Sequence, residues 1–193
     1  MKKYVLIAGV NGAGKSTLYQ TMDSLKDMKR INTDEIVRTF GSWKKPADVM
    51  EAGKIAVNRV KEYFIEGVSF NQETTLCGNA IIRNMKQAKK LGYEIELHYV
   101  SVDTVEIAKQ RIAYRVEHGG HGISDVDVER RYYKSLSQLK KVLEICDLVI
   151  MYDNSKVFKR FAIYRNGMLV SIENEISYWY EKYVKNNSEI LLN

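Results

Sequence analysis

The feature that most constrains this chain is an apolar run followed at once by a glycine-rich loop. Residues 4–8 read Tyr-Val-Leu-Ile-Ala, and residues 9–16 read Gly-Val-Asn-Gly-Ala-Gly-Lys-Ser, which fits G-x-x-x-x-G-K-S. Glycine tolerates positive φ and lets the backbone approach an anion closely, so successive N–H groups can face phosphate oxygens. The stretch therefore predicts a phosphate-binding loop between a buried strand and a helix.

Two side chains of this loop carry the expected chemistry. Lys15 would place its charge at the β- and γ-phosphates, and the Ser16 hydroxyl would ligate Mg²⁺. The other expected nucleotide contacts come from the rest of the loop: Gly9, Asn11, Gly12, Ala13, Gly14 and Thr17. ATP and Mg²⁺ are the predicted cofactors.

The remainder of the chain alternates between strand-like and helix-like segments. Strands are expected over 3–8, 29–32, 68–73, 93–102 and 148–152, and helices over 15–25, 46–66, 79–91, 104–117 and 125–145. This alternation predicts the α/β class, a three-layer sandwich with a five-stranded parallel sheet. Ligands then bind outside the carboxyl ends of the strands.

The C-terminal part departs from this alternation. Asn166-Gly167 separates two β-like runs, 157–165 and 168–172, and predicts a hairpin. A last helix is expected over 173–185. We interpret residues 1–193 as a single domain, with this hairpin and helix covering about 156–185.

Composition restricts the setting of the protein. The chain has 193 residues, 45% of them hydrophobic, which suits one domain with a proper core. No apolar run is long enough to span a bilayer. The apolar run that follows the short basic N-terminus turns at once into the phosphate loop, so we expect no signal peptide. Two cysteines, Cys77 and Cys146, do not make a disulfide framework and favour a cytoplasmic location. The net charge of +6 comes without a Lys/Arg block, so phosphorylated small molecules, and not nucleic acid, are the expected partners.

Acidic residues follow several predicted strands. Asp34 is the first choice for the base that deprotonates an attacking hydroxyl, and its alternative role is the N-cap of a helix over 35–40. Glu73, with Thr74, is expected to contact the substrate or to assist Mg²⁺, unless it is a solvated strand end. Asp103 is expected to cap the helix from 104. Asp153 precedes Asn154, which is assigned to an adenine-side loop.

Basic residues bracket a second glycine-rich loop, 118–122. Arg111 and Arg115 lie one turn apart before it, and Arg130, Arg131 and Lys134 follow it. Two helices joined by such a loop predict a lid over about 111–135, in which Arg115 and one of Arg130 or Arg131 neutralise the transferred phosphoryl group. The alternative is a pair of solvated helix faces.

Two aromatic types complete the candidates. His118 and His121 lack cysteine or carboxylate partners at metal-ligand spacing. Trp43 is expected to be a packed aromatic, with an acceptor pocket as the alternative.

Several of these motifs together resemble the zeta-toxin family of P-loop kinases, over roughly residues 4–155. They are the phosphate loop, Ile31-Asn32-Thr33-Asp34-Glu35, Glu73-Thr74-Thr75-Leu76-Cys77-Gly78, the segment from Gly119 to Leu136, and Tyr152-Asp153-Asn154-Ser155. The resemblance implies an ATP- and Mg²⁺-dependent kinase of a small-molecule hydroxyl, with Asp34 as base, Glu73 as a substrate contact and the lid arginines as charge stabilisers. In the best-known members the acceptor is UDP-N-acetylglucosamine, and a protein antitoxin is a possible partner.

Two other functions stay open at this point. One is a kinase of a different acceptor, such as a nucleoside, an antibiotic or a polynucleotide 5′-end. The other is a nucleotide-dependent switch without an acceptor. An Asn-Lys-x-Asp motif, which a guanine-specific switch would need, does not occur in the sequence.

Overall fold

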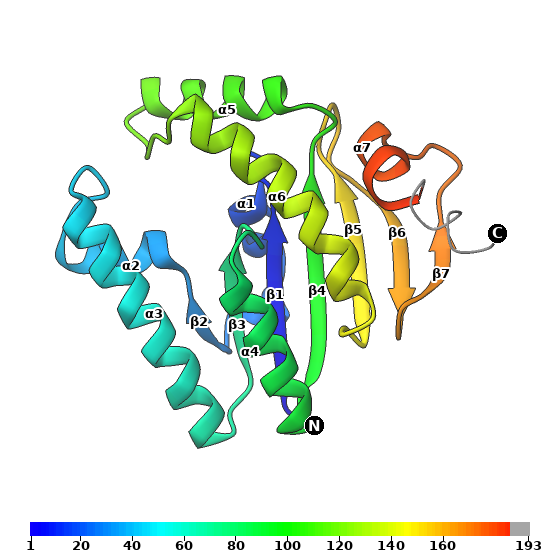
Figure 1. The fold of residues 1–193 in the computed structure, drawn as a ribbon, viewed down its shortest axis with the longest axis horizontal. Coiled ribbons are helices and arrows are strands. Elements are labelled where there is room, and N and C mark those ends of the chain that lie inside the picture. The colour runs from blue at the N-terminus through cyan, green and yellow to red at the C-terminus, as the bar shows by residue number, and fades with distance from the viewer. Residues whose placement is uncertain (186–193) are drawn as a thin grey trace.

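A seven-stranded sheet forms the centre of the molecule, in the order β2-β3-β1-β4-β5-β6-β7 (Figure 1). The computed structural model describes residues 1–185. Five neighbouring strands are parallel: β1 (Lys3–Gly9), β2 (Lys29–Ile31), β3 (Phe70–Thr74), β4 (Glu94–Ser101) and β5 (Leu148–Asp153). The alternation of strands and helices therefore predicted the α/β class and the parallel part of the sheet correctly.

The predicted count of five strands was wrong for the sheet as a whole. The hairpin of β6 (Lys159–Arg165) and β7 (Met168–Ile172) pairs antiparallel with β5 and extends the same sheet. Its turn is Asn166-Gly167, with φ of 48° and 79°, as a two-residue hairpin requires. Without the hairpin, β5 would present an unpaired edge, which proteins commonly cover.

The helices follow their local signals closely in most places. They are α1 (Lys15–Gln20), η1 (Asp23–Leu25), α2 (Thr33–Phe40), α3 (Pro46–Glu66), α4 (Asn79–Lys90), α5 (Val105–Glu117), α6 (Asp125–Leu143), α7 (Tyr178–Tyr180) and η2 (Glu181–Lys185). The predicted helix 15–25 is split into α1 and the 3₁₀ turn η1. The predicted C-terminal helix starts only at Tyr178, because the chain beyond β7 stays paired with β6 through Glu173 N–H and the Phe161 carbonyl, 2.8 Å apart.

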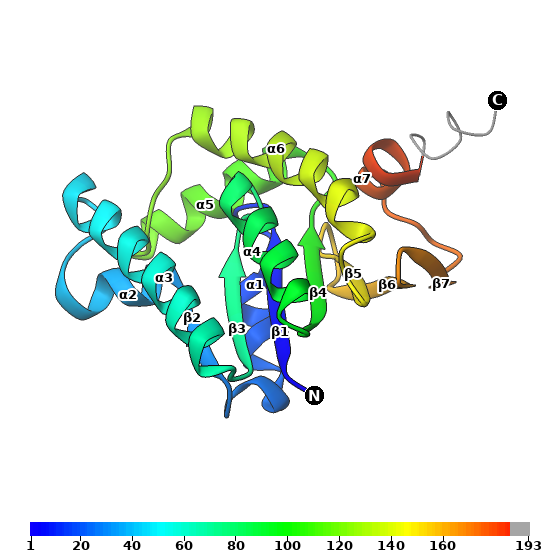
Figure 2. The same ribbon diagram turned by 60° about the horizontal axis from the view of Figure 1, so that its bottom comes forward.

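The helices cover both faces of the sheet and one of its ends. In Figures 1 and 2, α3, α4 and α6 lie on one face and α1 lies on the other. Helix α5 crosses the end of the sheet toward which β1 and β4 point (Figure 1). Among the described residues, no helix is both long and apolar enough to cross a membrane.

The order of the parallel strands decides which loops meet. β3 lies between β1 and β2, and Ile7 of β1 is in register with Glu73 of β3. The loop after β1, the end of β3 and the start of α2 after β2 therefore share the carboxyl edge of the sheet. This edge carries the candidate site.

Candidate active site

The loop between β1 and α1 is held by close packing on both sides. A Cβ at Gly9 would lie 1.9 Å from the Val100 carbonyl oxygen of β4, and one at Gly14, where φ is +97°, would lie 2.8 Å from the Asn154 amide. The Asn154 side chain donates a hydrogen bond of 2.8 Å to the Ala13 carbonyl. The Asn154 side chain thus packs against the loop on the side of β5, and β4 packs against Gly9. Bulkier residues could not replace Gly9 or Gly14 without a shift of neighbouring atoms.

Lys15 extends from the first turn of α1 across this loop. Its side chain is only 9% exposed, and its Nζ donates to the Val10 carbonyl at 2.9 Å. Burial lowers the pKa of Lys15, while the nearby carboxylates of Glu73 and Asp34 oppose that shift. The ammonium is thus held on the loop, and Lys15 lines the same cavity as both carboxylates.

Glu73, at the end of β3, forms the polar centre of the site. The Ser16 hydroxyl donates to its Oε1 at 3.0 Å, and the Asn32 amide donates to its Oε2 at 3.0 Å. Arg30 Nη2 lies 2.9 Å from the same Oε2. The alternative interpretation of Glu73 as a solvated strand end is wrong, because its side chain is only 12% exposed.

Asp34 lies in the first turn of α2 but does not cap that helix. The cap is Asn32, whose side-chain oxygen accepts from the N–H groups of Asp34 and Glu35 at 2.9 and 3.4 Å. The Asp34 carboxylate is exposed and lies in the cavity wall. Because Asn32 performs the capping, the Asp34 carboxylate is free to act on a ligand.

The lid arginines divide into two kinds. Arg111, Arg115 and Arg131 line the cavity, and the Nε and Nη2 of Arg115 are buried without a hydrogen-bond partner among the described residues. Arg130 is not among the described residues that line the cavity; it pairs at 2.7 Å with Asp127, which does line it, and its side chain is 64% exposed. Of the two alternatives left open for the lid, Arg131 is therefore the one that the cavity favours, and its catalytic role stays a prediction.

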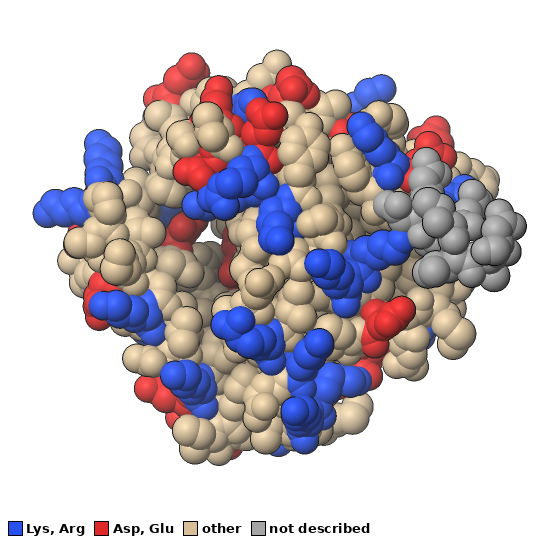
Figure 3. All heavy atoms as spheres, viewed as in Figure 1, with Lys and Arg blue, Asp and Glu red and all other residues tan. Residues whose placement is uncertain are grey.

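These side chains surround one cavity of about 970 Å³ between the phosphate loop, α3 and the lid. Figure 3 shows the surface hollowed between α3 and α6, with acidic side chains inside the hollow. The predicted residues in its wall are Asn11, Gly12, Gly14, Lys15, Ser16, Thr17, Asp34, Glu73, Thr74, Arg111, Arg115 and Arg131. The site thus combines loop, carboxylates and cations in one space.

Two aromatic residues, His121 and Trp43, also line the cavity; for Trp43 the sequence favoured a packed aromatic and kept an acceptor pocket as the alternative. The His121 ring, from the loop between α5 and α6, lies 5.4 Å from the Trp43 ring, between α2 and α3. Burial lowers the pKa of His121; Asp34 opposes this, while Arg115, Arg131 and Arg38 add to it. Pro46, Val49 and Met50 continue the apolar wall beside Trp43.

Thr74 and Asp103 have roles that only the fold reveals. The Thr74 hydroxyl accepts from the Leu76 N–H at 3.1 Å, in a turn where Leu76 has a φ of 59°. The prediction that Asp103 caps α5 is wrong, because Thr104 is the cap and accepts from Ile107 N–H at 3.3 Å. The Asp103 carboxylate instead accepts from Trp179 N–H. Asp103 therefore anchors the C-terminal segment to the lid base.

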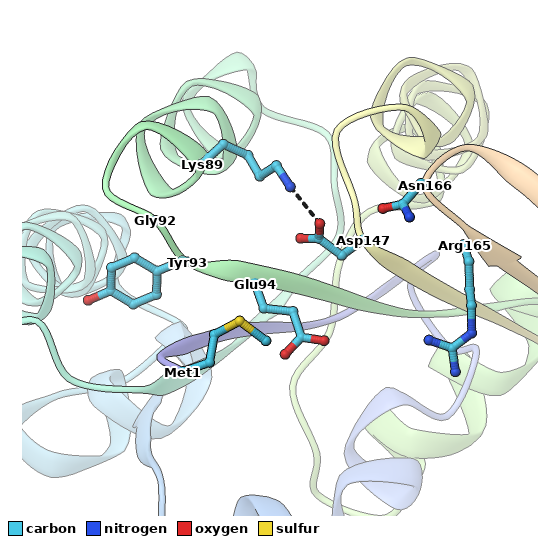
Figure 4. A pocket seen from close by; sticks show the side chains of 8 residues that line it. All are labelled: Met1, Lys89, Gly92, Tyr93, Glu94, Asp147, Arg165 and Asn166. Carbon is cyan, nitrogen blue, oxygen red and sulfur yellow. Dashed lines mark hydrogen bonds and ion pairs between the residues drawn. The ribbon is translucent and has the colours of Figure 1, made fainter.

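A smaller hollow of about 400 Å³ lies at the opposite, amino end of the strands (Figure 4). Its polar centre is the ion pair between Lys89 and Asp147, 2.6 Å apart, and Asp147 also accepts from Ile95 N–H at 2.7 Å. These contacts join the end of α4 to the start of β4 and β5.

Comparison with known families assigns the chain. The profile of the family described as AAA domain matches residues 5–136, more than half of the chain. The protein belongs to this family. A Haemophilus influenzae relative, described only as an uncharacterized protein, is 34% identical over 131 residues, covering 67% of this chain and 92% of the relative.

Similar solved structures agree on the fold. The AvrRxo1-ORF1:AvrRxo1-ORF2 complex with sulphate ions gives a TM-score of 0.71 at 15% identity, covering 95% of this chain. The present chain spans 63% of that protein's length. The PezAT chromosomal toxin–antitoxin system of Streptococcus pneumoniae gives 0.60 at 17% identity, covering all of this chain and 83% of the other. The chain thus has a P-loop kinase-like α/β fold.

Proposed function

We propose that the protein transfers the γ-phosphoryl group of ATP to a hydroxyl group of a small molecule. The observation that carries this proposal is that one cavity brings Lys15, the Ser16–Glu73 pair, Asp34, Arg115 and Arg131 together. A nucleotide switch would not need an exposed carboxylate, Asp34, facing the same space as Arg115, whose Nε and Nη2 are buried without a hydrogen-bond partner among the described residues. The AvrRxo1 pair, which has also been solved with ATP, supports the nucleotide assignment.

The proposed roles follow from the positions. Asp34 would take the proton of the acceptor hydroxyl while the oxygen of that hydroxyl forms a bond to the γ-phosphorus. The bond from that phosphorus to the β–γ bridging oxygen breaks, and ADP leaves with the electron pair. Lys15, Arg115 and Arg131 would neutralise the phosphate charges during this transfer, a contribution of several kcal/mol in related sites.

Mg²⁺ fits the oxygen groups beside the phosphate loop. The Ser16 hydroxyl and Glu73 carboxylate are hard oxygen donors, as this ion prefers, and they already lie within 3.0 Å of each other. Among the described residues, no cluster of three or more His, Cys, Asp and Glu could hold a metal alone. The ion would therefore need nucleotide phosphates as ligands, and when bound it would neutralise their charge.

The favoured acceptor is UDP-N-acetylglucosamine or a related nucleotide sugar. The resemblance of the motifs to zeta toxins supports this choice, as does the fold shared with the PezAT system. The cavity also has room for an acceptor beside Trp43 and the apolar wall of α3. The proposal includes toxicity, a possible antitoxin partner and a cytoplasmic location, in which Cys77 and Cys146 stay free.

The test is a screen for phosphoryl transfer from γ-labelled ATP to a panel of hydroxyl metabolites. The panel contains nucleotide sugars, nucleosides, aminoglycosides and 5′-hydroxyl oligonucleotides. Label on a nucleotide sugar, absent with Asp34→Asn, is expected. Label on another acceptor would support the kinase activity but change the assigned substrate. ATP binding without any transfer would favour the nucleotide-dependent switch.

A further inference from the structure

Arg30 is the middle residue of the three-residue strand β2, and its guanidinium contacts the Glu73 carboxylate of the site. Its side chain is 12% exposed, and all three guanidinium nitrogens donate hydrogen bonds. Nη2 lies 2.9 Å from Glu73 Oε2, Nη1 donates to Asn71 Oδ1 at 3.0 Å, and Nε donates to Glu35 Oε1 at 2.9 Å. The Tyr19 ring of α1 covers its flat face, with 3.5 Å from the guanidinium carbon to the ring centroid.

These contacts fix how the Glu73 carboxylate is turned. Arg30 and Asn32 both donate to Oε2, and the Ser16 hydroxyl is closer to Oε1, at 3.0 Å, than to Oε2, at 3.3 Å. One oxygen is therefore anchored by Arg30 of β2 and by the α2 cap Asn32, and the other is presented to Ser16 of the phosphate loop. A charge-assisted contact of this kind sets orientation as well as energy.

Arg30 also reaches the helix that carries the proposed base. Glu35, its second carboxylate partner, follows Asp34 directly in α2, and Asn32 caps the same helix. One guanidinium thus joins the end of β3, the start of α2 and, through Tyr19, α1. A lysine could not make these contacts together, because its ammonium is a point donor and lacks the planar fork.

We propose that Arg30 is a positioning residue that orients Glu73 toward Ser16 and so prepares the site for a Mg²⁺-bound nucleotide. This inference rests on the proposed function only in taking the nucleotide site as real, and it holds for any acceptor. Partners that orient metal-facing carboxylates typically contribute 10- to 100-fold to metal affinity or activity. A merely structural ion pair would instead affect stability without any preference for Mg²⁺.

The test compares ADP binding by calorimetry, with and without Mg²⁺, in the full-length protein. The variants are Arg30→Met, Arg30→Lys, Glu73→Gln and the double variant Arg30→Met/Glu73→Gln. Arg83→Met, at an exposed arginine of α4, is the matched control. Melting temperatures are measured for all of them, and Arg30→Lys, which keeps the positive charge, covers the case in which Arg30→Met fails to fold.

The compared quantity is the ratio of ADP affinity with Mg²⁺ to ADP affinity without it. We expect this ratio to be smaller in both Arg30 variants than in the wild type, by roughly tenfold or more. Binding without Mg²⁺ should change by less than about threefold, since Lys15 and the loop remain. The double variant should be no weaker than Glu73→Gln, because a residue that acts through another shows non-additive effects. Arg83→Met should match the wild type.

Several results would overturn the proposal. They are an unchanged Mg²⁺ effect in folded Arg30 variants, equal losses with and without Mg²⁺, or additive losses in the double variant. None of these requires an acceptor, so a failed metabolite screen leaves the measurement intact. A wild type that binds no nucleotide would instead refute the proposed function, and this inference with it.

Discussion

Asp34 and Asn32 divide two tasks that one short acidic residue could perform alone. Asn32 satisfies the first N–H groups of α2, while the Asp34 carboxylate lies in the cavity wall. We therefore expect Asp34→Asn to lower the transfer rate by about 10²–10⁴-fold, as loss of a general base does. The melting temperature should hardly change.

The measurement is single-turnover transfer, with calorimetry for ATP and a melting curve for each variant. Asp125→Asn, at an exposed acidic residue in the first turn of α6, is the control. A large loss of stability in Asp34→Asn, or a normal rate, would contradict the role as base.

Arg130 and Arg131 are adjacent and chemically identical, and they provide a matched pair. We expect Arg131→Ala to lose on the order of 10²-fold in kcat, as the removal of a preorganised charge contact does. Arg130→Ala should change kcat little, because Arg130 is an exposed charge paired with Asp127 and is not among the described residues that line the cavity. Steady-state kinetics of both variants decide the matter, and the reverse order of effects would show that the lid rearranges around the substrate.

Lys15 is expected to make nucleotide affinity depend on pH. Burial lowers the pKa of Lys15, and phosphate oxygens would favour its charged form again. ADP affinity should therefore fall as the pH rises through the pKa of Lys15 in the free protein, below the ordinary lysine value of 10.5. Lys15→Met should bind ADP weakly and lose this alkaline dependence, which calorimetry between pH 7 and 10 would reveal.

Among the helices and strands, the sequence predicted correctly those boundaries that depend on neighbouring residues in the chain. Helix α3 begins at Pro46 and ends before Gly67, as expected, because both residues act within one turn of the chain. The start of the last helix and the docking of the hairpin depend on pairing with β6 and β5, which no short stretch of sequence encodes. The strand count was wrong for the same reason.

Two glycines in different elements should respond oppositely to alanine. Gly53 lies inside α3 with nothing within 4 Å of an added Cβ, so Gly53→Ala should stabilise the protein by roughly 0.5–1 kcal/mol. Gly167 has a φ of +79° in the hairpin turn, a conformation that alanine disfavours. Gly167→Ala should therefore lower the free energy of unfolding by roughly 1 kcal/mol or more. Urea unfolding measures both, and a shift of the same sign in each would contradict the argument.

The whole molecule assembles its site from distant parts of the chain, and this limits prediction from sequence. Lys15, Asp34 and Glu73 could be grouped in advance, because parallel strands bring their carboxyl ends to one edge. The choice between Arg130 and Arg131 depends on rotation of α6, about 100° per residue, and could not be read from spacing alone. Arg30 and His121 were missed as site residues, and the pocket position of Trp43 was only the alternative, because these places arise only where β2, the α2–α3 segment and the lid meet.

The chain contains two tryptophans, and their surroundings differ. Trp179 is fully buried, with its indole N–H donating to Asp153, whereas Trp43 stands in the cavity wall against His121 and below Arg38. An acceptor entering the cavity should thus change the intrinsic fluorescence of one indole and leave the other constant. Titration of candidate acceptors at 295 nm excitation would identify binders without labels, and Trp43→Phe should abolish the signal while Trp179 emission persists.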